Sequence, residues 1–309
     1  MSTATIQRAS RTPPRQHIRS RAGQEHPWTF AVPALVVLGL FLVLPTLLNF
    51  VLPYTDWSAF KSNLRFVGLA NFGSITSDGS LQQALRITLT YAVLVAVFQN
   101  GLGLGLALLL ERDTWLNRLA RSVFFLPVLI SALAGGYIAQ AMLKPDGGLN
   151  QILSALSGQP VEIAWLGSST WTVVVVALVH GWKWMGLAML IYLAGLKSVP
   201  HELIEAGRID GASGIQIFRR IKFPLLAPAI TFNVATALIG TLNGFDIVQA
   251  TTGGGPARST EILNIFIFRT FGSGLYAQAS AMSLVLFLAV VIIAVPLIIY
   301  LRSREKVLA

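Results

Sequence analysis

The sequence contains no cysteine, which excludes disulfide bonds, thiolate catalysis and cysteine-based metal sites. Charge is also scarce. Asp, Glu, Lys and Arg make up 12% of the 309 residues, about half the fraction in an average soluble domain. The four histidines are scattered along the chain, so no metal centre is indicated. The sequence therefore predicts neither a metal nor another cofactor.

A phosphate-binding loop is missing as well. The segment Gln99-Asn100-Gly101-x-Gly103-x-Gly105 is rich in glycine, but it lies in an apolar run and lacks the Lys-Ser/Thr ending of such a loop. Small residues in an apolar run favour close packing of membrane helices instead. No nucleotide site is expected, so the chain itself should hydrolyse nothing.

Long apolar runs dominate what remains, since 54% of the residues are hydrophobic. Several uncharged runs exceed the ~18 residues that a transmembrane helix requires. Helices are the default because an open sheet cannot satisfy its backbone in lipid. The sequence predicts an all-α polytopic membrane protein with six transmembrane helices, at about residues 30–52, 87–110, 122–143, 170–196, 223–245 and 279–301.

Basic residues are distributed unevenly between the two sets of connecting segments. Sixteen of the 23 Lys and Arg residues lie in the N-terminal arm, in segments 111–121 and 197–222, and in the C-terminal tail. Six lie in the alternate segments, and Lys183 lies within the fourth run. Because cytoplasmic loops carry the excess of Lys and Arg, both termini are expected in the cytoplasm. This topology explains the net charge of +10 without a nucleic acid partner.

This topology predicts four parts. Residues 1–28 form a basic cytoplasmic arm that we expect to be disordered, and residues 29–84 hold the first transmembrane helix and an extracytoplasmic loop. Residues 85–301 form the transmembrane core, and residues 302–309 a cytoplasmic tail. A cleaved signal peptide is the alternative for the N-terminus. The first apolar run is long enough to span and no small-residue cleavage site follows it, which favours an uncleaved span.

Residues 198–228 form a polar segment on the cytoplasmic side, and they read as two short helices joined by a turn. Pro200 suits a helix start, and Asp210-Gly211 is a turn dipeptide. Ser213 with Gln216 matches a capping box for the second helix. From the residues alone, this can be a rigid knob for a partner or an ordinary amphipathic loop.

The same segment resembles the EAA loop of ABC importer permeases. The match consists of Glu205-Ala206-Gly207, Asp210-Gly211-Ala212-Ser213, Phe218, Ile221, Pro224 and Pro228. The family usually has a second alanine where this chain has Gly207, a change that costs about 1 kcal/mol of helix propensity. Motifs shared with the carbohydrate branch occur in the family's order at residues 66–72, 148–153, 193–196, 200–203 and 251–256.

The resemblance implies a type I ABC importer permease fold in the cytoplasmic membrane of a bacterium or archaeon. It implies a second homologous permease, two ATP-binding cassette ATPase subunits and an extracytoplasmic solute-binding protein as partners, besides the lipid bilayer. The substrate would be a sugar or related polyol, with glycerol phosphate derivatives left open. The ATPase-coupling residues would be Glu205, Ala206, Gly207, Asp210, Gly211, Ala212, Phe218 and Pro224.

Candidates for the substrate path lie in the fourth and fifth runs. Lys183 is a charge in mid-span, which costs about 2.5–3.5 kcal/mol for insertion, so it should face a cavity or a partner. It is either a donor to the substrate or a structural charge. Trp182 can supply an aromatic platform, and only one of Trp182 and Trp184 can face a given cavity. Asn243 and Asp246 share a helical face; Asp246 can bind substrate, pair with Lys183 or cap a helix end.

Two other classes of membrane protein are possible from composition. An ion-gradient-driven secondary transporter predicts paired intramembrane carboxylates and repeated halves with broken helices. An intramembrane enzyme requires a nucleophile with its base, or a metal set, within the spans. Neither pattern is found in the sequence, and neither class explains the segment 198–228.

Overall fold

The computed structural model describes residues 31–242 and 244–308. The chain divides into two units, of which the first extends to Leu47 and the second begins at Leu48. The described part of the first unit is helical. It contains α1 (Val32–Leu38), a π-helical turn (Gly39–Val43) and the start of α2 (Leu44–Val51). The uncharged stretch Val32–Tyr54 is long enough to cross a membrane. The N-terminal arm, residues 1–28, lies outside the described residues.

The second unit is built from helices. Among the described residues the β-type pairing is one isolated bridge, between Thr55 and Phe66. The helices are α3 (Ala70–Ser77), α4 (Ser80–Leu109), α5 (Trp115–Leu129), α6 (Ala132–Met142), α7 (Gly148–Ser157), α8 (Thr172–Lys197), α9 (His201–Ile209), α10 (Gly214–Ile217), α11 (Phe223–Leu225), α12 (Ala227–Leu242), α13 (Phe245–Thr251), α14 (Leu263–Gly272) and α15 (Tyr276–Leu308).

The predicted six spans are matched by four long apolar helices and two bent pairs. Within the described residues, Val32–Tyr54, Ser80–Leu109, Thr172–Lys197 and Tyr276–Leu301 are each long enough to cross a membrane. Helices α5 and α6 form one pair, bent by 102°, and α10 to α12 form the other, bent by 67°. The prediction of an all-α polytopic protein is confirmed, and the count reaches six when each bent pair is one span.

Two expected spans differ from the structure. Residues 122–143 do not form one continuous helix, because the chain is extended at Ile130. A new helix, α6, begins at Ala132, and the Ser131 hydroxyl caps it by accepting a hydrogen bond from the backbone N–H of Ala134. Pro127, which has no N–H, lies in the last turn of α5. The fifth span ends at Leu242, and Phe245 begins the separate helix α13. Asp246 is therefore on α13 and not on the fifth span.

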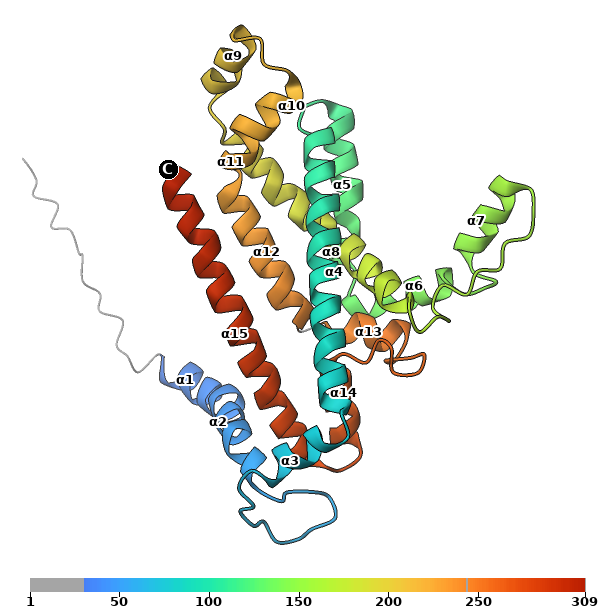
Figure 1. Cartoon of the computed structure of the whole chain (residues 1–309), viewed down its shortest axis with the longest axis vertical. Helices are drawn as coiled ribbons and strands as arrows, with labels where there is room; N and C mark the ends of the chain where they lie inside the picture. Colours follow the sequence, from blue (N-terminus) through green and yellow to red (C-terminus); the bar gives the residue numbers. More distant parts are fainter. Residues whose placement is uncertain (1–30, 243, 309) are drawn as a thin grey trace, which may run out of the picture. The chain divides into compact units, whose positions relative to one another are not determined.

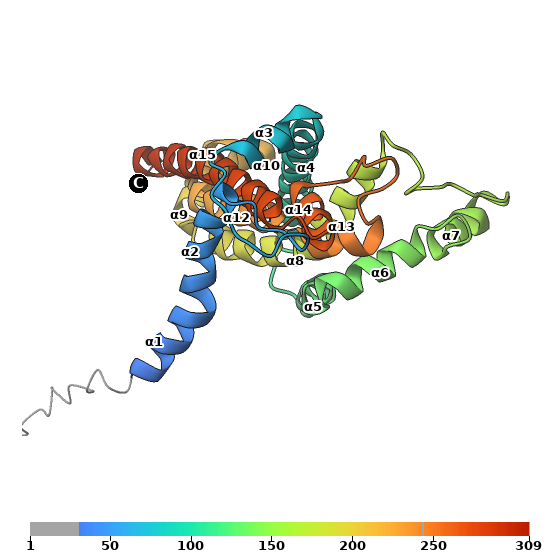
Figure 2. The same ribbon diagram turned by 90° about the horizontal axis from the view of Figure 1, so that it is seen from below.

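The core of the second unit lies where α4, α8 and α12 pack together. Tyr91 and Val95 of α4 and Val176 of α8 belong to one buried cluster. Gly103 of α4 lies against α8, because a Cβ there would come within 2.7 Å of the Ala188 Cβ. This confirms the packing interpretation at Gly103. In two views, α6 and α7 extend away from this bundle (Figures 1 and 2).

The connections of the second unit gather at opposite ends of the bundle (Figure 1). Helices α9 and α10 and the turn between α4 and α5 lie at one end. Helix α3, the start of α4 and helix α14 lie at the other end. The segments with many basic residues, 111–121 and 197–222, therefore share an end, as the expected topology requires.

Candidate functional site

The segment 198–228 folds as two short helices around a fixed turn. Pro200 occupies the position before the first residue of α9, and α10 begins after Ser213. The Ser213 hydroxyl accepts a hydrogen bond from the backbone N–H of Gln216, and the Gln216 side-chain oxygen accepts one from the N–H of Ser213 at 2.7 Å. The predicted capping box is confirmed. Gly211 has φ of +78°, a conformation that glycine adopts at no steric cost.

A small apolar core holds the two helices together. Val199, Ile204 and Ile217 are buried against one another, with Ile221 and Leu225 beside them. The backbone N–H of Ala212 donates to the Gly207 carbonyl at 2.9 Å and closes the turn. The segment is therefore a preorganised two-helix unit, here called the knob, comprising residues 199–225. The other interpretation of this segment, an ordinary amphipathic loop, would not need an apolar core of its own.

Gly207 lies at the closest approach within the knob. A Cβ at this position would lie 3.0 Å from Cδ1 of Ile221 and 3.6 Å from Cγ1 of Ile217. An alanine would therefore require Ile221 to move by a few tenths of an ångström. This contact gives a physical reason for the glycine where the EAA pattern usually has alanine.

The outer surface of the knob combines charge with exposed apolar groups. Glu205 is exposed and its Oε1 lies 3.1 Å from Nδ1 of His201. Ala206, Asp210 and Gly211 are exposed, whereas Ala212, Phe218 and Pro224 are half-buried. Two residues that the sequence reasoning missed flank the turn: Ile209 is 86% exposed and Ile215 is 72% exposed. Exposed apolar groups beside a turn are typical of a surface that a partner covers.

An ion pair joins the knob to the connection that follows α4. Lys222 Nζ donates to both carboxylate oxygens of Glu111, each at 2.7 Å, and both side chains are partly buried. The Arg121 guanidinium fixes the same end of α4 by donating to the Leu110 carbonyl at 2.6 Å and to the Arg112 carbonyl at 3.0 Å. The knob is therefore tied to the connection between α4 and α5. The sequence reasoning missed Glu111, because the pair is 111 residues apart.

Lys183 is buried, with 3% of its surface exposed, and it binds the end of α5. Its Nζ donates to the carbonyl oxygen of Ile130 at 2.7 Å and lies 3.3 Å and 3.4 Å from those of Pro127 and Val128. The last carbonyls of a helix have no partner within it, and a cation there also suits the helix dipole. Within the described residues Lys183 forms no ion pair with Asp246, so the pairing that the sequence allowed is not found.

The other path candidates lie apart. Trp182 and Asp246 are exposed, and Asn243 lies outside the described residues. Trp184, in contrast, lines a cavity of about 130 Å³ among α4, α8 and α12, together with Gln99, His180 and Thr236. The hydroxyl of Tyr91 lies 2.7 Å from Nδ1 of His180 and fixes this ring. Of the two tryptophans, Trp184 is the one that faces this cavity.

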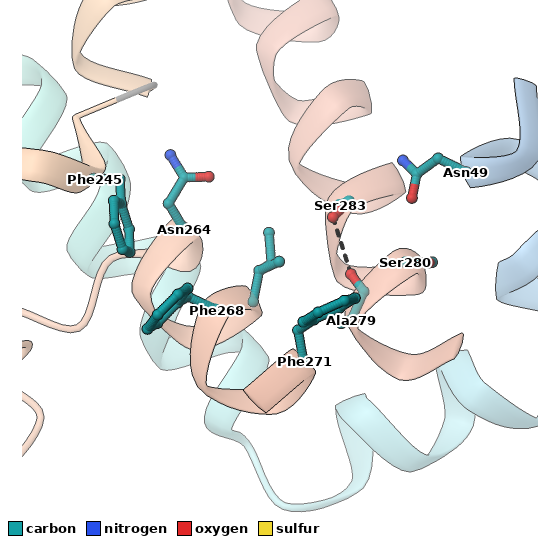
Figure 3. A pocket seen from close by; sticks show the side chains of 9 residues that line it. Asn49, Phe245, Asn264, Phe268, Phe271, Ala279, Ser280 and Ser283 are labelled. Carbon is teal, nitrogen blue, oxygen red and sulfur yellow. Dashed lines mark hydrogen bonds between the residues drawn. The ribbon is translucent and has the colours of Figure 1, made fainter. Parts of the chain in front are cut away.

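A larger cavity of about 460 Å³ lies beside α14 and α15. Figure 3 shows the rings of Phe245, Phe268 and Phe271 along it, with Asn264 from α14. The rings of Phe245 and Phe268 are 5.0 Å apart between centroids. Aromatic faces combined with a few amide and hydroxyl groups are typical of small-molecule sites with mixed polarity.

Comparison with known sequences identifies the family. Residues 99–306 match the binding-protein-dependent transport system inner membrane component family. This chain belongs to that family. It is 31% identical over 288 residues to AmyD of Thermoanaerobacterium thermosulfurigenes, a probable permease for starch degradation products, covering 91% of this chain and 94% of AmyD. It is 31% identical to MsmF of Streptococcus mutans, a multiple sugar-binding transport system permease, covering 87% and 92%.

Other comparisons agree with this family and with its fold. UgpA of Agrobacterium fabrum, an sn-glycerol-3-phosphate permease, is 30% identical and covers 86% of this chain and 90% of its own length. A chain of a bacterial ABC transporter that imports alginate superposes with a TM-score of 0.72 at 23% identity, covering 90% of this chain and 94% of that chain. This chain is thus a permease subunit with the fold of ABC importer permeases.

Proposed function

We propose that this chain is one permease subunit of an ATP-driven importer for a sugar or a related polyol. It forms half of the translocation pathway, and a second homologous permease forms the other half. The substrate class is supported by the relatives named for starch degradation products and multiple sugars. Glycerol phosphate is the second candidate, because UgpA is nearly as similar.

The coupling role rests on the knob. A transporter that ATP drives must transmit the closure of its ATPases to the spans, and a floppy loop would absorb that motion. The knob has its own buried core, a capped second helix and the Lys222–Glu111 pair that joins it to the connection after α4. Two separate ATPase subunits would dock below the pair of permeases and hydrolyse ATP. The exposed face of this knob, with Glu205, Asp210 and Gly211, would contact an ATPase.

The proposed topology places the knob and both termini in the cytoplasm of a bacterial or archaeal cell, with the chain multi-pass in the inner membrane. The uneven distribution of Lys and Arg supports this orientation. The division into an arm, a first span with its loop, a core at 85–301 and a tail follows from it. A solute-binding protein then delivers the substrate to the end of the bundle that contains α3 and α14.

The substrate path would run beside α8. The cavity at Trp184, with Gln99 and His180, combines an aromatic face with hydrogen-bonding groups. Trp182, Lys183, Asn243 and Asp246 remain candidates for other points along the path. An energy loss of about 1–3 kcal/mol for each polar partner left unpaired would give such a site its selectivity.

The test is reconstitution of this permease with its partner permease, ATPase subunits and solute-binding protein, taken from neighbouring genes, in proteoliposomes. We expect uptake of radiolabelled sugar that requires both ATP inside and the binding protein outside. Uptake of sn-glycerol-3-phosphate instead would move the substrate to the second candidate. Uptake driven by an ion gradient without ATP would contradict the proposed mechanism and support a secondary transporter.

A further inference from the structure

A buried glutamine lies unpaired at the wall of the cavity at Trp184. Gln99, on α4, is 5% exposed, and its side chain forms no hydrogen bond or ion pair with any residue that the structure describes. Its amide atoms keep accessible surface at the cavity, whereas the unpaired Oδ1 of Asn233 is fully enclosed. Buried polar atoms are normally hydrogen-bonded, so an unpaired amide that faces a cavity indicates a group that binds there.

The amide is held at a fixed position by the contact between α4 and α8. A Cβ at Gly181 of α8 would come within 3.1 Å of the backbone nitrogen of Gln99 and within 2.9 Å of the Phe98 Cβ. His180, the preceding residue, also lines the cavity, and the Tyr91 hydroxyl lies 2.7 Å from its Nδ1. The polar groups of the wall therefore come from side chains that packing has already oriented.

The cavity has a buried base and an exposed rim. Gln99 and His180 are buried, whereas Leu187, Thr236 and Gly240 are exposed on the surface of this chain. If the rim faced lipid, the amide would lack a hydrogen-bond partner, because hydrocarbon offers none. Polar side chains within spans normally face a water-filled cavity or the interior of a bundle. The rim is therefore expected to face the aqueous path between the permeases.

The lining residues that the structure describes include no Asp, Glu, Lys or Arg. The Nζ of Lys183 donates to the Ile130 carbonyl at 2.7 Å and lies 4.7 Å from the centre of the Trp184 ring, and Lys183 is not part of the lining. An amide donates and accepts, as a hydroxyl group does, whereas an ionised phosphate or carboxylate only accepts. A buried anion without a cation would be costly, so this cavity favours a neutral group.

The size of the cavity limits what can enter it. Its volume of about 130 Å³ equals the share of roughly four water molecules in the liquid. This space admits one hydroxylated edge of a solute, with the Trp184 ring as the apolar face beside it. The rest of the solute would then lie in the path outside the rim.

We propose that Gln99 is a specificity-determining residue for the transported solute, and that its amide binds a hydroxyl group of a neutral polyhydroxylated compound. The cavity would disfavour phosphate esters and sugar acids. The proposal rests on the proposed importer function and decides between its two candidate substrates, in favour of the uncharged sugar or polyol.

The first experiment measures ATP-driven uptake by the complete transporter, with its binding protein at saturation, in proteoliposomes. The probes are radiolabelled glucose, maltose, lactose and sn-glycerol-3-phosphate, and the wild type should take up a sugar and not the phosphate ester. Gln99→Met should lower uptake of this sugar about tenfold, because a hydrogen bond to the solute is lost. Gln83→Met, an exposed glutamine on the same helix, is the matched control and should transport as the wild type does.

Thermal unfolding separates this role from a structural one. Gln99→Met should raise the Tm of the permease, because an unpaired buried amide is replaced by an apolar side chain of similar length. Wild-type uptake by Gln99→Met would overturn the proposal, and so would lost uptake together with a lowered Tm. Uptake of sn-glycerol-3-phosphate by the wild type at the rate of the sugar would also overturn it.

A second measurement does not depend on uptake. Thr236→Cys gives the cysteine-free chain one thiol on the rim, which should react with a water-soluble methanethiosulfonate reagent in the complete transporter. Ile292→Cys, at an exposed position in the apolar part of α15, is the control and should not react. An unreactive Thr236→Cys would place the rim in lipid and overturn the site even where uptake is normal. A wild type that takes up no probe with ATP, but whose Thr236→Cys reacts, would instead contradict the importer function on which the proposal rests.

Discussion

The Nζ of Lys183 donates a hydrogen bond to the carbonyl oxygen of Ile130 at 2.7 Å, across a sequence separation of 53 residues. This contact lies where α5 ends and the chain bends by 102° into α6. A break inside an apolar run leaves helix carbonyls without N–H partners, and lipid offers none. The buried charge of Lys183 thus lies against the unpaired carbonyls at the break in a neighbouring span.

Replacing Lys183 tests which of its two interpretations holds. Lys183→Met should lower the free energy of unfolding by about 1–3 kcal/mol, because the carbonyls at the end of α5 lose their donor. Thermal unfolding in detergent measures the change, and Lys197→Met at the exposed end of α8 is the control. Normal stability combined with a transport loss of about tenfold would instead make Lys183 a donor to the substrate.

The pair between Glu111 and Lys222 should be needed for coupling. Glu111→Gln and Lys222→Met should each lower the ATP-driven uptake rate, and the double mutant should lose less than the sum of the two. We expect a coupling energy of about 1 kcal/mol in this cycle. The Glu111→Lys, Lys222→Glu exchange should restore part of the uptake. Strictly additive losses would show that the pair does not transmit motion.

Gly211 tests the fixed turn of the knob. No atom lies within 4 Å of a Cβ built there, so the cost of a side chain comes from φ of +78°. Gly211→Leu should leave insertion intact and abolish uptake, through about 1–2 kcal/mol of backbone strain and through bulk on the docking face. Gly211→Asn, which tolerates this φ, should keep more activity. Uptake at the wild-type rate in Gly211→Leu would remove this residue from the coupling surface.

The orientation can be read from single cysteines, because the natural chain has none. Ser74→Cys and Ala257→Cys, at exposed positions of the α3 end, should react with an impermeant maleimide added outside intact cells. Ser213→Cys, exposed on the knob, should react only after the membrane is opened. Labelling of Ser213→Cys from outside would reverse the topology and place the knob beyond the reach of ATPases.

Asp56 should order the connection between the first span and α3. Its carboxylate accepts from the Arg65 backbone N–H at 2.7 Å and pairs with Lys61 at 2.9 Å, and these contacts lower the pKa of Asp56. A lowered pKa means that this contribution to stability is complete at neutral pH and is lost as the pH falls through the depressed value. Asp56→Asn should therefore speed tryptic cleavage at Lys61 and Arg65 at pH 8. Unchanged cleavage would show that the backbone alone orders this segment.

The sequence predicted the local features of the knob correctly. The capping box at Ser213 and the turn at Gly211 depend on a few neighbouring residues, so turn chemistry sufficed. The exposure of Ile209 and Ile215 was missed, because an apolar residue on a short amphipathic helix is normally assigned to a core. The function of the knob, and the roles of Trp182, Asn243 and Asp246, remain predictions that the experiments above address.

The sequence by itself determined the number and the approximate limits of the apolar runs and the asymmetry of Lys and Arg. These properties depend on whether each segment contacts lipid or water, and not on which other segments lie beside it. Only the tertiary structure decided where the third span breaks, that Lys183 binds carbonyls of α5, and that Lys222 meets Glu111 across 111 residues. A buried charge must find a partner, but the sequence does not say which of several distant groups the packing will bring within 3 Å.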